Sequence, residues 1–449
     1  MKTIDMTEGK PFVLMIKFSV PMLFANVLQM LYTLADSAII GRFLGVNAFA
    51  AVGETVSPYW FAFGVVLGVT HGFGTIFAQH FGAKDSPGLN RAFTTAVLLS
   101  AIIGAALACV GLILCKPALT LLNTPPELMD GAVLYLSFLL GGMPLILAYN
   151  LLGAMLRALG DSRTPFFATV VGTILNIVLD LALVIPFGIG GVAAATLLAQ
   201  LAACLYCAYH LRNIREARPA RRNLSAASAK SLLRLGAPLS LRNVVIEIGC
   251  FTVQVYVNSY GAIFLAGFSA AVRMYSLLMI AGNAMEASCA TFVAQNFGAK
   301  RFDRVKRGVA TGLKIMLISS AIIGAFALLF GRDLLNLLIA GDPEQITAVL
   351  DVGQRQLNAL ALGLPVLYLL LFYRAALQGI GNSFIPMLSG FMELIGRILS
   401  VTLLTHVFGV WGVFLADPLS WIFAAALLIT AYYIEYRRIL NLELRKEQT

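Results

Sequence analysis

The sequence contains twelve long runs of apolar residues that are separated by short, more polar loops. Most runs reach the roughly 20 residues that an α-helix needs to cross the hydrocarbon core of a bilayer. They lack the two-residue alternation of apolar and polar side chains that is typical of the strands in a membrane β-barrel. Because only helices and closed barrels satisfy their backbone hydrogen bonds in lipid, we predict an all-α integral membrane protein with twelve transmembrane helices.

The composition supports this fold class. Of the 449 residues, 59% are hydrophobic and 12% are charged, whereas soluble domains carry about 25% charged residues. The first run is too long for the core of a cleaved signal peptide, so we expect it to remain as the first helix. The expected helices lie near residues 12–40, 50–77, 91–115, 128–156, 163–186, 188–211, 236–260, 264–294, 306–330, 346–377, 384–407 and 411–434.

The net charge of +10 comes mainly from Lys and Arg residues between the apolar runs. Every second loop is basic, and the alternate loops are short and nearly uncharged or acidic. By the positive-inside rule, this pattern predicts a multi-pass protein of the bacterial cytoplasmic (inner) membrane with both termini in the cytoplasm. It also argues against nucleic-acid binding, because the basic residues do not gather on one solvated face. The densest basic group is Arg212, Arg215, Arg218, Arg221 and Arg222.

The sequence repeats itself in the same order after about half its length. Residues 77–84 (FAQHFGAK) return as residues 293–300 (VAQNFGAK), an offset of 293 − 77 = 216. Residues 160–165 (GDSRTP) return as residues 381–386 (GNSFIP), an offset of 381 − 160 = 221. Self-similarity at a nearly fixed period indicates a duplicated structural unit. The other matches are residues 188–192 with 409–413 at an offset of 221, and Pro21 and Asn26 with Pro238 and Asn243 at 217.

Six expected helices separate the two copies, so the repeats run parallel and are related by an axis along the membrane normal. We predict an N-terminal lobe over residues 1–211, a basic cytoplasmic linker over 212–235, and a C-terminal lobe with a short tail over 236–449. Two similar lobes favour alternating access, in which one lobe rocks against the other, as in secondary transporters. A channel or a receptor gives less reason for the duplication.

The motifs in these repeats resemble those of the multidrug and toxic compound extrusion (MATE) family. They are Pro21 and Asp36 in the first helix, the turns at 79–83 (QHFGA) and 295–299 (QNFGA), and the loop at 157–165 (RALGDSRTP). The resemblance implies a secondary active exporter with two six-helix lobes, which exchanges H⁺ or Na⁺ for organic, often cationic or amphipathic compounds. It implies no enzymatic activity, no catalytic residue and no cofactor besides the coupling ion, and we expect a monomer in the lipid bilayer.

Two aspartates lie within apolar runs of the N-terminal half. Asp36 is flanked by leucines and isoleucines, and Asp180 follows Asn176 by four residues, so that these two side chains share one helix face. An ionisable residue at membrane depth is costly and indicates a functional site by default. Two carboxylates near one another in a medium of low dielectric are costly when both are charged, so such a pair is suited to bind a proton or a monovalent cation.

The family resemblance assigns the coupling ion to the same residues. It implies a cation-coupling site formed by Asp36, Asn176, Asp180 and Thr196. The alternative is that these side chains only form hydrogen bonds between helices. At the offset of 221, Asn176 corresponds to Arg397 and Asp180 to Val401, and Asp36 falls near residues 252–253. The acidic pair therefore has no copy in the second half, which predicts different roles for the two lobes.

The charges of the second half remain open to several interpretations. Glu247 matches an acidic position that one branch of the family uses in its C-terminal lobe, but residues 364–373 lack the aspartate that accompanies it there. Glu247 is therefore a candidate either to neutralise a cationic substrate or to pair with an arginine. Glu393 and Arg397 are four residues apart, which favours an ion pair within one helix. The other candidates for contacts with substrate or between charges are Arg273, Glu286 and Arg374.

Pro21 is a candidate hinge that would let the first helix change its bend when Asp36 binds a proton, although prolines also bend membrane helices without functional consequence. A lipid-linked oligosaccharide flippase is the alternative function, since Arg273, Arg374 and Arg397 could face a pyrophosphate. The acidic first half argues against it. We predict no metal site other than a Na⁺ that could occupy the cation-coupling site, because the four histidines show no ligand spacing.

Overall fold

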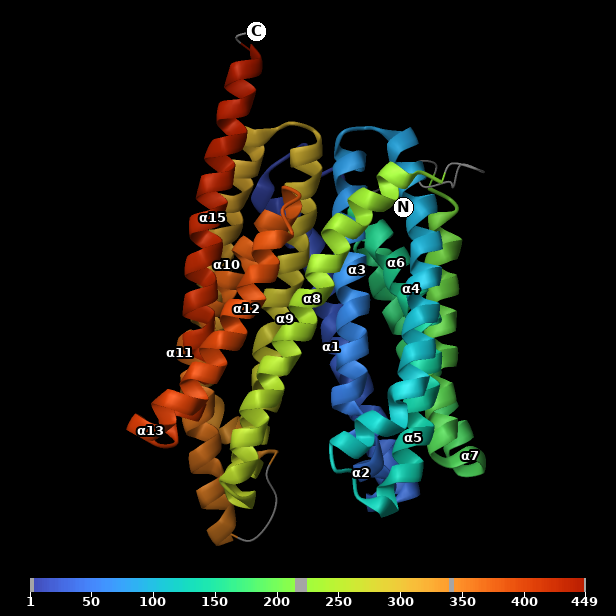
Figure 1. Cartoon of the computed structure of the whole chain (residues 1–449), viewed down its shortest axis with the longest axis vertical. Helices are drawn as coiled ribbons and strands as arrows, with labels where there is room; N and C mark the ends of the chain where they lie inside the picture. The colour runs from blue at the N-terminus through green and yellow to red at the C-terminus, as the bar shows by residue number, and fades with distance from the viewer. Residues whose placement is uncertain (1–3, 215–223, 339–342, 448–449) are drawn as a thin grey trace. The chain divides into compact units, whose positions relative to one another are not determined.

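A computed structural model describes residues 4–214, 224–338 and 343–447, and these residues contain helices but no strand (Figure 1). The elements are α1 (Pro11–Leu44), α2 (Val46–Glu54), α3 (Val56–Gly82), α4 (Ser86–Leu121), α5 (Pro126–Gly141), α6 (Met143–Ala158), α7 (Arg163–Leu211), α8 (Ala226–Ser259), α9 (Ala262–Gly298), α10 (Phe302–Asn336), α11 (Pro343–Gly379), α12 (Phe384–Leu399), the π-helix η2 (Ser400–Leu404), α13 (Thr405–Phe408), α14 (Trp411–Phe414) and α15 (Ala416–Glu447).

The helices account for the twelve predicted membrane spans. In the described part of the chain, nine helices are long and apolar enough to cross a membrane, or ten when α5 and α6, bent by 46°, count as one broken span. The 49-residue α7 contains a non-helical residue, Gly188, and therefore holds two of the predicted spans. The 34-residue α8 is long enough to cross but carries Arg242 and Glu247, which lower its hydropathy. The described spans therefore number 10 + 1 + 1 = 12.

The backbone repeats at the same offsets as the sequence. Left-handed conformations are uncommon for residues other than glycine, yet Lys84 (φ 57°) and Lys300 (φ 56°) both adopt one at the ends of the two FGAK turns. Each remaining pair has similar positive φ values: Gly45 (83°) with Gly261 (89°), Gly160 (80°) with Gly381 (90°), and Gly188 (56°) with Gly409 (58°). The repeat is thus one of structure, and the first of these glycine pairs adds a match that the sequence motifs did not include.

The described chain divides into two compact units. The N-terminal unit comprises Met1–Glu8, Lys17–Ser240 and Gly298–Lys300, and the C-terminal unit comprises Gly9–Ile16, Leu241–Phe297 and Arg301–Thr449. Both α1 and α8, the first helices of the two repeats, therefore contribute segments to both units. Residues 215–223 of the predicted linker, which include four of its five most clustered arginines, lie outside the described residues.

In the N-terminal unit, α6 packs against α3, α4 and α7, and α2 lies beside α5 at one end (Figure 1). The first part of α8 packs closely on α3 at two glycines. A Cβ atom on Gly68 would lie 2.2 Å from the backbone nitrogen of Ser240, and one on Gly72 would lie 2.5 Å from that of Gly236. Ser240 Oγ also donates a hydrogen bond to the carbonyl oxygen of Val65 (3.1 Å). Small residues permit this backbone approach, as they do in many membrane helix pairs.

We expect Gly68→Ala to lower the free energy of unfolding by about 1–3 kcal/mol, because the new methyl group must push the backbones of α3 and α8 apart. Gly53→Ala is the matched control, since a Cβ on Gly53 meets no atom within 4 Å. That variant should change stability by less than about 1 kcal/mol, through helix propensity alone. Thermal unfolding in detergent measures both, and equal stability of the two variants would contradict the close contact.

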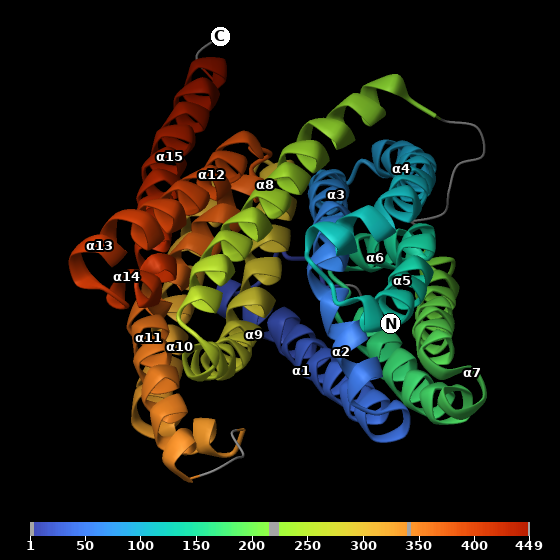
Figure 2. The same cartoon turned by 60° about the horizontal axis from the view of Figure 1, so that its bottom comes forward.

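In the C-terminal unit, α11 packs against α10 and α15, and α12 packs against α15. A cluster of buried apolar side chains, including Phe264, Phe268 and Phe414, fills one end of this unit. The predicted helix near 384–407 is interrupted there by η2 and is followed by the short α13 and α14, which Figure 2 shows beside α15. Such π-helical turns interrupt the regular spacing of side chains. The span therefore ends in an irregular segment instead of continuing straight.

Candidate functional site

The two predicted aspartates meet inside the N-terminal unit. Asp36 projects from α1, while Asn176 and Asp180 project from one face of α7. The side chains are almost fully buried: Asp36 is 7% exposed, and Asn176 and Asp180 are 0% exposed. Asn176 and Asp180 are four residues apart, so their side chains lie on one face of α7. Asp36 of α1 lies near this face and supplies the second carboxyl group.

Asn176 bridges the two carboxyl groups. We assign its amide nitrogen to the side that faces them, because the opposite orientation would place the amide oxygen against acceptors only. In this orientation Asn176 Nδ2 donates hydrogen bonds to Asp36 Oδ1 (2.8 Å) and to Asp180 Oδ2 (3.0 Å). The three residues thus form one polar cluster that ties α1 to α7.

The hydrogen bonds of Asn176 do not satisfy the whole pair. Asp180 Oδ1 is buried and has no hydrogen-bond partner, and the carboxyl groups of Asp36 and Asp180 both contact the same amide group. Two ionised carboxylates in such a place would repel one another and would both lose their hydration. The geometry is therefore suited to bind one proton or one small cation.

Thr196 and Tyr32 extend the cluster. Tyr32 Oη donates to Thr196 Oγ1 (3.3 Å), and Thr196 Oγ1 donates in turn to the carbonyl oxygen of Val192 (3.1 Å). Thr196 lies in the second half of α7 and is 6% exposed. Tyr32 was not among the predicted site residues. The signal that would have found it is its position four residues before Asp36, which places both on one face of α1.

The cluster borders a small cavity of about 40 Å³, lined in part by Tyr32 and Thr196. A water molecule needs about 10–15 Å³ of such volume, so the cavity has room for a few waters. Apolar side chains, including Ile39, Ile40 and Val184, pack as a core cluster around the neighbouring turns of α1 and α7. The cavity therefore adjoins the end of the cluster formed by Tyr32 and Thr196. The other polar lining residues are Gln29, Tyr149, Thr169, Thr173 and Gln200.

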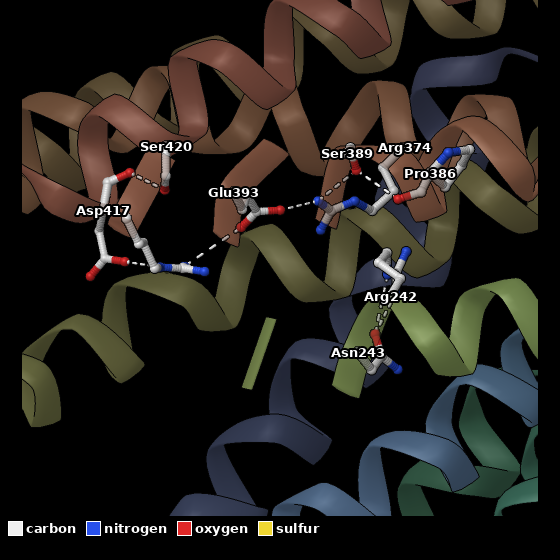
Figure 3. Close-up of polar contacts among 9 residues, drawn as sticks. Arg242, Asn243, Arg374, Pro386, Ser389, Glu393, Asp417 and Ser420 are labelled. Atoms are coloured by element: carbon white, nitrogen blue, oxygen red, sulfur yellow. Dashed lines mark hydrogen bonds and ion pairs between the residues drawn. The ribbon is translucent and has the colours of Figure 1, made fainter. Parts of the chain in front are cut away.

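The buried charges of the C-terminal unit form a row of ion pairs (Figure 3). Arg374 Nη2 donates to Glu393 Oε1 and to Ser389 Oγ (3.0 Å). The other carboxylate oxygen of Glu393 lies 3.6 Å from Arg397 Nη2, so the predicted pair within α12 is present. Arg397 Nε donates to Asp417 Oδ1 of α15 (2.7 Å). Sequence reasoning missed Asp417, since nothing in the local pattern links it to α12.

The repeat explains why this row differs from the acidic cluster. At the offset of 221, Asn176 corresponds to Arg397, and Thr196 corresponds to Asp417 (196 + 221 = 417). A guanidinium–carboxylate pair thus stands where the N-terminal unit has an amide and a hydroxyl group. Arg397 fits because Gly249 leaves room: a Cβ there would lie only 3.1 Å from Arg397 Nη1. An arginine already supplies the positive charge at this place in the second repeat.

The remaining predicted acids form no ion pair with either cluster, but Glu247 interacts electrostatically with Arg397, and Glu286 with Arg242 and Arg374. Glu247 and Glu286 are half-buried, and neither has an ion-pair partner within 4.0 Å among the described residues. Arg273 is exposed. Pro21 lies inside α1, which continues through it. Only Arg374 of the four predicted charge residues takes part in the buried row.

Comparisons with known proteins agree with this architecture. The MatE family model matches the chain twice, over residues 21–182 and 238–403, with offsets of 238 − 21 = 217 and 403 − 182 = 221. A probable multidrug resistance protein of Bacillus subtilis, YoeA, is 28% identical over 88% of this chain and 84% of its own length. An FAD transporter of Shewanella oneidensis is 25% identical over 94% of both chains.

A solved structure described as MATE in the bent conformation has the same fold. Its TM-score is 0.88 at 23% sequence identity, and the match covers 98% of this chain and 99% of the other. The two matches to the family model fall on the two structural repeats and cover most of the chain. This chain therefore belongs to the MATE family of membrane transporters, which are multi-pass helical proteins and not enzymes.

Proposed function

We propose that the chain exports small organic compounds in exchange for a coupling ion that binds at Asp36, Asn176, Asp180 and Thr196. The observation that carries this proposal is the buried pair of carboxyl groups, in which Asp180 Oδ1 has no partner. The small cavity beside Tyr32 and Thr196 supports access of water and ions. Relatives described as multidrug resistance proteins support amphipathic, often cationic compounds as substrates.

Coupling requires that the ion and the substrate each bind the alternating conformations with unequal affinity. Ion binding at the acidic pair removes the repulsion between the carboxylates, so it favours the conformation in which the two groups are closest. The proposed lobes are residues 1–211 and 236–449, joined by the linker 212–235, and Pro21 is the proposed hinge of α1. The proposed setting is the bacterial cytoplasmic membrane, with both termini in the cytoplasm and the protein as a monomer.

We take H⁺ as the coupling ion, because one shared proton removes the repulsion between the two carboxyl groups. Na⁺ is the alternative that the transport measurement below distinguishes.

The test is transport into inverted membrane vesicles that contain the protein, with ethidium as a fluorescent cationic probe. An imposed proton gradient should drive ethidium uptake, and an imposed sodium gradient of equal size should not. Uptake with the sodium gradient alone would reverse the choice of ion, and failure of both gradients would contradict the antiport. Vesicles without the protein supply the background rate.

A lipid-linked oligosaccharide flippase is the weaker alternative. It calls for a cationic site that faces a pyrophosphate, whereas the buried polar cluster of the N-terminal unit contains two carboxyl groups. Arg273, one of the three arginines expected to serve such a site, is exposed. The acidic cluster therefore supports the antiporter.

A further inference from the structure

The sequence motifs at 77–84, 160–165 and 293–300 take no part in the proposed ion site. They lie at or just after the ends of α3, α6 and α9. The first and the last of these motifs are in direct contact, because a Cβ atom on Gly298 would overlap the carbonyl group of Gln79. Residues 298–300 accordingly belong to the N-terminal unit, although the rest of α9 belongs to the C-terminal unit.

Residues 4–16, which precede and begin α1, are divided between the units in a similar way. The segment belongs to the N-terminal unit up to Glu8 and to the C-terminal unit beyond it. Ile4 N donates a hydrogen bond to the carbonyl oxygen of Gly160 (3.4 Å), the first residue of the second motif. Met6 is fully buried, so the beginning of the segment is packed into the N-terminal unit.

The same segment is bound within the C-terminal unit by side chains of α9 and α10. Arg304 Nη1 donates to the carbonyl oxygen of Gly9 (3.0 Å), and Arg304 Nε donates to Asn296 Oδ1 (2.9 Å). Ser288 Oγ donates to the carbonyl oxygen of Met15 (3.0 Å), whose side chain is fully buried. Hydrogen bonds from a guanidinium group are stronger than those between neutral groups. Arg304 therefore fixes both the segment and the turn at 295–300 to α10.

The chain between these contacts has little slack. Asn296 is bound in the C-terminal unit and Gly298 is packed in the N-terminal unit, only two positions further along the sequence. Met6 is buried in the N-terminal unit, and Gly9 is bound in the C-terminal unit three positions later. Since one residue spans at most about 3.6 Å, the units cannot separate at these points unless a contact breaks.

We propose that residues 4–16 and the turn at 295–300 form a latch, which holds the two units together and has to release when the units change their arrangement. Arg304 holds the latch through its two hydrogen bonds, and Gly298 permits the contact through its lack of a side chain. α1 continues from the latch to Asp36, so one helix connects the latch with the ion site. The role of release in transport rests on the proposed exchange between lobes, whereas the latch itself does not.

The separation of the units is measured by single-molecule fluorescence energy transfer between dyes at Arg91 of α4 and Arg437 of α15, which are both exposed. An azide-bearing amino acid replaces each of these arginines, so that the six native cysteines remain. The full-length protein is reconstituted in nanodiscs without substrate or ion gradient. We expect Arg304→Gln and Gly298→Ala each to raise the ratio of the long-distance to the short-distance population at least about tenfold, the ratio for about 1.4 kcal/mol.

The two variants act on different contacts of the latch. Arg304→Gln removes the donor to Gly9, and Gly298→Ala places a methyl group against the backbone of α3. Arg304→Lys keeps the charge but has only one donor group to share, so its shift should be smaller than that of Arg304→Gln. Arg307→Gln, an exposed change on α10, and Gly53→Ala, where a Cβ meets no atom within 4 Å, are the matched controls and should leave the distances unchanged.

Unchanged distances in both variants would overturn the latch, and so would an equal shift in Arg307→Gln, because a general loss of basic charge would then explain it. Thermal unfolding checks that each variant is folded, and Arg304→Gln decides alone if Gly298→Ala does not fold. Ethidium transport is a separate measurement. If the wild type does not transport but the variants shift the distances, the proposed function fails and the latch stands. Transport by the wild type with unshifted distances in the variants removes the latch and leaves the proposed function.

Discussion

Asp36→Asn and Asp180→Asn are each expected to reduce gradient-driven export to the background of vesicles without the protein. Asparagine keeps the size of the side chain and its ability to form hydrogen bonds, but it neither releases a proton nor attracts a cation. The measurement is ethidium uptake into inverted vesicles under an imposed proton gradient. Asp130→Asn is the matched control, since Asp130 is an exposed acid of α5 in the same unit.

The stability of these two variants distinguishes a role in ion coupling from a merely structural role. An amide is uncharged, so replacing either carboxyl group leaves no new buried charge. Because Asp180 Oδ1 also has no hydrogen-bond partner to lose, we expect the free energy of unfolding to change by about 1 kcal/mol or less. If the cluster only joined α1 to α7, the variants would lose stability and the folded fraction would still export. Export at the wild-type rate by Asp36→Asn or Asp180→Asn would remove these residues from the coupling site.

Arg397→Met is expected to lower the free energy of unfolding by about 3–5 kcal/mol, the usual cost of removing one partner of a buried ion pair. The side chain of Arg397 is 5% exposed and lies between Glu393 (3.6 Å) and Asp417 (2.7 Å). Methionine keeps most of the side-chain volume but leaves both carboxylates with less counter-charge in a buried place. Chemical or thermal unfolding in detergent provides the measurement.

An exposed ion pair in the same unit provides the control. Arg332 Nη1 lies 2.9 Å from Asp351 Oδ1, and the two side chains are 51% and 49% exposed. Arg332→Met should therefore cost less than about 1 kcal/mol. Adding Asp417→Asn to Arg397→Met should restore much of the lost stability, because Glu393 keeps Arg374 as its partner and Asp417 no longer carries an unpaired charge. Similar losses for Arg397→Met and Arg332→Met would show that the buried row contributes no more than a surface pair.

The contrast between the two units has a simple physical origin. Corresponding positions hold Asn176 and Thr196 in one repeat and Arg397 and Asp417 in the other. In the first repeat two acids share a bridging amide, and in our proposal a coupling ion supplies the positive charge. In the second repeat the guanidinium group of Arg397 supplies it permanently, so the proposal needs no second coupling site there. The sequence offset predicted this difference, and the ion pairs of Arg397 show how the second unit compensates.

Several features of the fold followed from local pattern alone. Apolar runs of membrane length predicted the spans, and the two copies of the FGAK turn predicted a structural repeat, which Lys84 and Lys300 confirm with matching left-handed backbones. The interruptions within the helices were harder to predict from the sequence. The bend of 46° between α5 and α6, and the π-helix η2 after α12, lie inside runs that read as continuous helices. Hydropathy records burial in lipid and does not record how a helix bends against its neighbours.

The sequence by itself determined that Asp36 and Asp180 are buried acids of the first repeat without counterparts in the second. A charge within an apolar run signals that a partner is needed, because its desolvation is costly in any fold. Which helix supplies that partner depends on packing between segments far apart in the chain. Only the tertiary structure decided that Asn176 bridges the two acids and that Asp417 pairs with Arg397.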